Sequence, residues 1–127
     1  MNIKDSKLVI ETPNGKMCPV RTAQKIIEGK WKFVILYYIS MGPVRFNKLQ
    51  KLIPNISHGV LSLQLKELEK SDMIHRKVYD ENPPKVEYSL TETGKNFLPA
   101  MNTLINFGKD YIKNHDIKFI KANIKNI

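Results

Sequence analysis

The sequence predicts an α+β fold, mostly α-helical, in which a single domain combines several helices with one short hairpin. A length of 127 residues with 42% hydrophobic residues is sufficient for one packed core. Apolar residues recur at helical spacing in four segments between residues 18 and 70. Two stretches, 73–79 and 86–90, instead alternate apolar and polar residues on either side of a polar loop, which is typical of a two-stranded hairpin.

The chain divides into an N-terminal arm over residues 1–17, a folded domain over 18–115 and a basic tail over 116–127. Charged residues interrupt the arm, which has no apolar h-region and therefore does not resemble a secretory signal. No apolar run approaches the roughly 18 residues of a membrane span. With its single cysteine the chain forms no internal disulfide, and we expect a cytoplasmic protein.

The first two helices of the domain are predicted from their boundaries and their apolar pattern. The first begins at Pro19, because proline at the first helical position loses no hydrogen bond, and it ends at Gly29. Its apolar residues that share one face are Val20, Ala23 and Ile27. The second helix, residues 31–40, is apolar almost all round, which places it in the core.

A short third helix over residues 45–53 is joined to a longer fourth helix by the tight connector 54–56. Ser57 stands at the N-cap of the fourth helix, where its side-chain oxygen can accept a hydrogen bond from an early helical amide. This helix runs to about Lys70. Its buried face carries leucines at helical spacing, namely Leu61, Leu65 and Leu68.

After the hairpin, Thr91 caps a long helix that extends to about His115 and bends at Pro99. This helix is longer than one small core requires and has apolar residues on more than one face. Residues 86–112 form a segment of net negative charge, so two copies can meet there without strong repulsion. We predict a two-fold homodimer built from this helix and the N-terminal arm or first helix, with contacts from Phe97, Met101, Leu104, Ile105, Phe107 and Tyr111.

The order of helix, helix, short helix, tight turn, capped helix, hairpin and long helix is that of a winged helix-turn-helix. The major groove of DNA admits one helix, here the fourth, and the hairpin forms a wing that reaches the flanking backbone. We expect the DNA contacts to come from Arg45, Ser57, His58, Gly59, Ser62, Leu63, Lys66, Arg76, Lys77 and Lys85. Leu63 either touches a thymine methyl group or is a stray exposed leucine or a subunit contact.

The net charge of +9 suits a polyanionic partner such as duplex DNA, although the positive charge is spread broadly along the chain. Lysine supplies 18 of the 21 basic residues, which favours attraction to phosphates over bidentate reading of bases. Catalytic and metal-site patterns are missing. The three histidines lie far apart without ligands at suitable spacing, and no glycine-rich phosphate loop follows a strand. We therefore expect no enzyme activity, no metal and no cofactor.

Several short fragments follow one another in a specific order: Cys18-Pro19-Val20, Gly29-Lys30-Trp31, Arg45-Phe46, Pro54-Asn55-Ile56-Ser57, Leu65-Lys66-Glu67-Leu68-Glu69 and Val86-Glu87-Tyr88-Ser89-Leu90-Thr91. Together they resemble the HxlR family of bacterial regulators, and the likeness covers residues 18–108. The resemblance implies homodimers, operator DNA as ligand and, in some members, sensing of oxidants or electrophiles through the cysteine that matches Cys18. Gly59 and Leu63 depart from the family pattern on the DNA-facing side, so the resemblance does not carry over a target sequence.

Cys18 has two interpretations. It falls at or next to the cap of the first helix, where unpaired amides and the positive end of the helix dipole favour a thiolate, so it is a candidate redox sensor. Alternatively, it is a small residue that fits this corner and is inert. Two other functions remain for the whole chain. One is a winged-helix protein-interaction module without specific DNA binding. The other is an enzyme that uses Cys18 as nucleophile, for which no motif supplies a positioned base.

Overall fold

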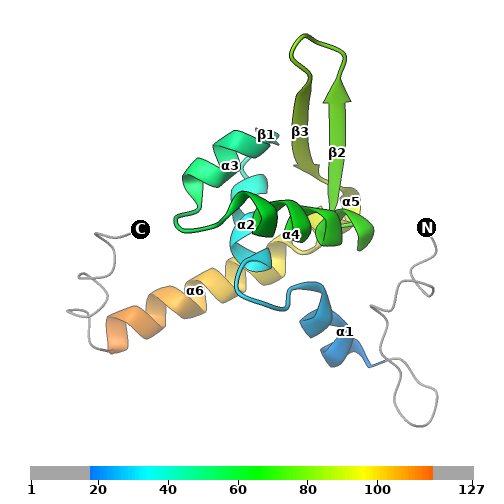
Figure 1. The fold of residues 1–127 in the computed structure, drawn as a ribbon. Coiled ribbons are helices and arrows are strands. Elements are labelled where there is room, and N and C mark those ends of the chain that lie inside the picture. Colours follow the sequence, from blue (N-terminus) through cyan, green and yellow to red (C-terminus); the bar gives the residue numbers. More distant parts are fainter. Residues whose placement is uncertain (1–17, 116–127) are drawn as a thin grey trace.

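The structure is a computed structural model, and it describes residues 18–115. The arm over residues 1–17 and the tail over 116–127 lie outside this part. The elements in chain order are α1 (Pro19–Ile26), α2 (Lys32–Ile39), β1 (Val44–Arg45), α3 (Phe46–Leu52), α4 (His58–Lys70), β2 (Ile74–Tyr79), β3 (Lys85–Leu90), α5 (Glu92–Asn96) and α6 (Leu98–Asn114). The β2–β3 hairpin projects from one side of the helical body, and α6 runs along the opposite side (Figure 1). The arrangement is a mostly helical winged helix, as the sequence predicts.

The core forms where α2, α3 and α4 meet. α2 is apolar almost throughout and buries Ile35, Leu36 and Ile39, which confirms its predicted place in the interior. The inward face of α4 also agrees with the prediction, and its buried residues are Leu61, Leu65 and Leu68. Because these leucines face the core, the residues on the opposite side of α4 face solvent.

The sheet has three strands rather than the predicted two, in the order β1-β3-β2. β1 is antiparallel to β3, and its two residues pair as Val44 with Tyr88 and Arg45 with Glu87. Arg45, expected as the first residue of a helix, is extended at φ −80° and ψ 154° and forms the N-cap of α3. A two-residue strand has no periodicity to detect, and it forms because β3 offers unpaired backbone groups at that edge.

The predicted long C-terminal helix is divided into α5 and α6 at Phe97, which closes the first and opens the second. Pro99 therefore does not bend a continuous helix. It lies in the first turn of α6, where a missing amide hydrogen costs nothing. The predicted cap at Thr91 is confirmed, because its side-chain oxygen accepts a hydrogen bond from the Gly94 amide at 3.0 Å.

The first helix ends earlier than predicted, at Ile26 instead of Gly29. Gly29 lies in the following connection with φ +95°, a conformation that side chains disfavour. No residue of α1 is buried in the described chain, and Val20 is 75% exposed. Val20 and Ala23 of α1 are therefore exposed in the described part of this chain, whereas Ile26 at its end packs against the core.

The turn after α4 ties the base of the wing to the rest of the domain. Asp72 has a positive φ of 64°, its carbonyl oxygen accepts a hydrogen bond from the Thr91 hydroxyl, and its Oδ2 accepts one from the Thr93 hydroxyl at 2.7 Å. Gly94 of α5 lies directly against the Met73 backbone. These contacts set where the wing stands relative to α4.

Candidate nucleic-acid interface

The outward face of α4 presents the residues that the leucine spacing predicts. Ser57 caps the helix, and its Oγ accepts a hydrogen bond from the Val60 amide at 3.1 Å. Beyond the cap, the exposed residues include His58, Gly59, Leu63 and Lys66, whereas Ser62 is half-buried. Leu63 is an exposed apolar residue on this face, at 53% exposure.

A groove of about 360 Å³ lies between α4 and the wing. It collects four of the predicted DNA contacts, which are His58, Ser62, Lys66 and Arg76. The groove also contains residues that the sequence did not suggest, among them Phe46, whose ring lies 4.6 Å from that of His58, and Glu69. The helical pattern places Phe46 only on the buried side of its helix, and no local signal puts it beside a histidine twelve positions later.

The wing separates its cations onto two faces. Arg76 pairs across the strands with Tyr88, and both line the groove beside α4. Lys77, the next residue, pairs with Glu87 and therefore faces the other side, because successive strand residues point in opposite directions. Lys85 shares that outer face, since it pairs with Tyr79, two positions from Lys77. The structure thus brings Arg76 together with α4, while Lys77 and Lys85 lie apart from it.

On the outer face of the wing, the Tyr79 ring contacts the ammonium groups of both Lys77 and Lys85. The Nζ atoms of Lys77 and Lys85 lie 4.8 Å and 4.6 Å from the centre of its ring. The Tyr79 hydroxyl donates a hydrogen bond to Glu87 Oε1 at 3.1 Å, and Lys85 Nζ lies 3.6 Å from Glu87 Oε2. The aromatic ring and the carboxylate hold these cations in place and offset part of their charge.

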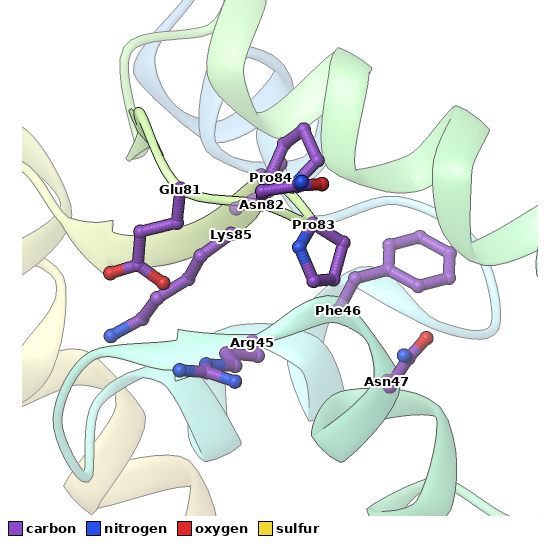
Figure 2. A pocket seen from close by; sticks show the side chains of 9 residues that line it. Arg45, Phe46, Asn47, Glu81, Asn82, Pro83, Pro84 and Lys85 are labelled. Atoms are coloured by element: carbon purple, nitrogen blue, oxygen red, sulfur yellow. The ribbon is translucent and has the colours of Figure 1, made fainter.

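Arg45 and Lys85 meet at a second cavity, of about 380 Å³, between the start of α3 and the hairpin loop. In Figure 2 the charged ends of Arg45, Lys85 and Glu81 lie on one side, and the rings of Phe46 and Pro83 lie on the other. This arrangement brings together two predicted DNA contacts that are 40 positions apart in the chain. The Glu81 carboxylate beside them reduces the local positive potential.

The predicted dimer residues fall into two groups. Met101 is a correction, because it is 2% exposed and packs in the core of its own chain, where a second subunit cannot reach it. Phe97 and Ile105 also pack against that core, and the Phe97 ring stands edge-on to Phe33 at 6.2 Å. The remaining residues are exposed and form what we call the α6 stripe: Leu104, Phe107 and Tyr111.

Cys18 is half-buried at the N-cap of α1, and its carbonyl oxygen accepts a hydrogen bond from the Thr22 amide at 2.9 Å. In residues 18–115 no group of three or more histidine, cysteine, aspartate or glutamate side chains is arranged to hold a metal ion. Within the same range, no helix has the length and apolar character needed to cross a membrane.

Comparison with known proteins relates this geometry to a family. The family model described as "HxlR-like helix-turn-helix" matches residues 26–116. The chain is 49% identical over 94 residues to "Uncharacterized HTH-type transcriptional regulator YdeP" of Bacillus subtilis (strain 168), a match covering 74% of this chain and 73% of that protein.

Two solved structures are similar in fold and sequence. "Redoxregulator HypR in its reduced form" superposes with a TM-score of 0.72 at 39% identity, covering 77% of this chain and 100% of that one. The reduced form of "the transcriptional regulator YodB from B. subtilis" gives a TM-score of 0.69 at 32% identity, with coverages of 79% and 99%. The fold, the groove beside α4 and these matches agree, and the chain belongs to the HxlR-like helix-turn-helix family of transcriptional regulators.

Proposed function

We propose that this protein is a sequence-specific DNA-binding regulator that acts as a homodimer on operator DNA. The observation that carries the proposal is the groove between α4 and the wing, where His58, Ser62, Lys66 and Arg76 converge. A recognition helix with a wing beside it can enter the major groove while the wing follows the adjacent backbone.

The groove residues divide by chemistry. Lys66 and Arg76 have no ion-pair partner within the described residues, so both charges are available to phosphates. His58 and Ser62 carry side chains that exchange hydrogen bonds with base edges, and Leu63 offers an apolar contact to a thymine methyl group. Arg45, Lys77 and Lys85 add phosphate contacts from the second cavity and the outer face of the wing.

Salt-dependent binding of duplex DNA tests this proposal. Lys66→Ala and Arg76→Ala should each weaken binding to all duplexes and reduce the salt dependence by about one unit of slope per lost phosphate contact. His58 and Ser62 variants should instead change the preference between sequences. Lys95→Ala is the matched control, because Lys95 lies on α5 and pairs with Glu92 at 3.3 Å. Unchanged affinity and slope in both groove variants would contradict the docking geometry.

The homodimer is supported by apolar surface that the described chain leaves uncovered. The α6 stripe carries Phe107, which is 67% exposed, and α1 presents Val20. Phe107 also contacts Tyr111, with ring centres 6.3 Å apart. A two-fold dimer through these helices would place two α4 helices on one duplex, and its operator would be an imperfect palindrome with half-sites about one helical turn, or a small multiple, apart.

Redox control through Cys18 is the second part of the proposal. Both similar regulators named above are solved in a reduced form, and HypR is described as a redox regulator. Cys18 is partly accessible at the start of α1, next to the exposed Val20. Its oxidation would join two subunits or attach a small thiol, and either product would act at the proposed dimer contact.

A further inference from the structure

Lys32, the first residue of α2, is buried in the interior of the protein. Its side chain is 8% exposed, and its Nζ lies 2.7 Å from Oε2 of Glu67 on α4. Within residues 18–115 it is the only charged residue that is buried. The position is costly, because the ammonium group loses hydration and stands at the positive end of a helix. Because the partner Glu67 is 45% exposed, the attraction between the two charges offsets only part of this cost, so stability alone does not explain this lysine.

The pair holds α4 on the side away from the wing. At 3.6 residues per turn, Glu67 points about 140° away from Ser62, which lines the groove. It also lies outside the inward face made by the three leucines. The wing therefore flanks one side of α4, and Lys32 of α2 reaches the other.

An ion pair restrains α4 in a way that its leucines do not. The three buried leucines fix the inward face of α4 by close packing, and the ion pair adds a directional restraint on the side of the helix away from the wing. A rotation of α4 about its axis matters for DNA reading. With a helix radius of about 5–6 Å including side chains, a turn of about 10° moves an outward side-chain end by about 1 Å. Hydrogen bonds to base edges do not tolerate that displacement.

A second ion pair, formed by Lys25 of α1 and Glu28, lies within electrostatic range of Glu67. Lys25 Nζ lies 2.7 Å from Glu28 Oε1. Its hydrogen bond to Glu28 and the Glu28 charge raise the pKa of Lys25, and the charge of Glu67 adds to this effect. Glu67 thus has a second cation within electrostatic range and is itself half-exposed. Removing the Lys32 charge therefore leaves Glu67 in a tolerable environment.

We infer that Lys32 is a positioning residue that, through Glu67, sets the rotation of the DNA-reading helix and thereby the sequence preference of the protein. The inference rests on the proposed function, because it concerns how α4 meets bases. It adds a residue from the interior that touches no DNA.

The test compares affinity for a duplex selected from a random library with affinity for a scrambled duplex, at one salt concentration. Lys32→Met removes the pair but keeps the volume of the side chain. Glu67→Asp keeps both charges and changes only the reach of the carboxylate. We expect the affinity ratio to fall about tenfold in each, the size of one good base contact. Glu67→Asp should leave the salt slope unchanged, and Lys32→Arg, which can keep the pair, should retain the ratio.

Controls separate positioning from stability and from the proposed function. Lys95→Met removes a lysine from an exposed pair and should change neither quantity. Circular dichroism confirms folding, and if Lys32→Met does not fold, Glu67→Asp decides. A wild-type protein that binds no duplex, or binds all duplexes equally, overturns the proposed function. A selective wild type whose Lys32→Met and Glu67→Asp variants keep its ratio overturns the inference alone.

Discussion

Gly94 provides a stringent test of how the wing is attached. A Cβ atom built at this position would overlap the Met73 carbonyl oxygen and would lie 3.1 Å from Leu90 Cδ2. The obstructing atom belongs to the backbone, and that carbonyl also accepts a hydrogen bond from the Thr91 amide at 3.2 Å. The overlap between the added Cβ and the Met73 carbonyl oxygen can therefore be removed only if α5 moves away from the base of the wing.

The expected cost of Gly94→Ala follows from two opposing effects. Overpacking costs about 1–3 kcal/mol, and an overlap with backbone belongs at the upper end of that range. Alanine returns up to about 1 kcal/mol of helix propensity, because Gly94 is helical. The net loss is about 2 kcal/mol, and each kcal/mol lowers Tm by about 4–8 °C in a domain of 60–100 residues.

Thermal and urea unfolding at a fixed protein concentration measure this loss by circular dichroism. Gly59→Ala is the matched control, because Gly59 is helical and a Cβ there has no neighbour within 4 Å. The control should gain up to about 1 kcal/mol from helix propensity. If Gly94→Ala is as stable as the control, the close backbone approach does not exist and the reasoning is refuted.

Two further predictions concern assembly and redox response. Phe107→Glu should shift a sedimentation profile from dimer to monomer at micromolar concentration, because it places a charge in the α6 stripe, whereas Asn102→Glu, at another exposed position of α6, should not. A wild-type monomer under these conditions would contradict the dimer. Diamide or a quinone should change operator affinity in the wild type and leave Cys18→Ser unaffected, as a gel-shift titration would show. Equal responses in both proteins would make Cys18 a structural residue.

The candidate site was predictable where local periodicity determines it. The leucine spacing of α4 and the cap at Ser57 place His58 and Lys66 on the outward face without any tertiary information. Strand alternation also predicts that Arg76 and Lys77 lie on opposite faces of the wing, because adjacent strand residues point in opposite directions. Arg76 accordingly lines the groove beside α4, whereas Lys77 faces the other side of the wing.

The division of the C-terminal helix shows the limit of local reasoning. A proline inside an apolar helical pattern is compatible with a bend, a break or a helix start. In this structure the proline lies at the start of a helix. Phe97, which separates α5 from α6, packs against Phe33. Met101 of α6 is buried in the core, which removes it from the set of residues that a second subunit can reach.

By itself the sequence determined the order of α1 to α4 and of the β2–β3 hairpin, the apolar identity of α2 and the two faces of α4, because each depends on residues within a few turns of one another. Only the tertiary structure decided that β1 joins the sheet, that Gly94 meets the Met73 backbone and that Lys32 reaches Glu67. These contacts join residues more than 20 positions apart, so their existence depends on how whole elements pack. Periodicity reports which face of an element is apolar, but it does not report which partner that face or a charge beside it meets.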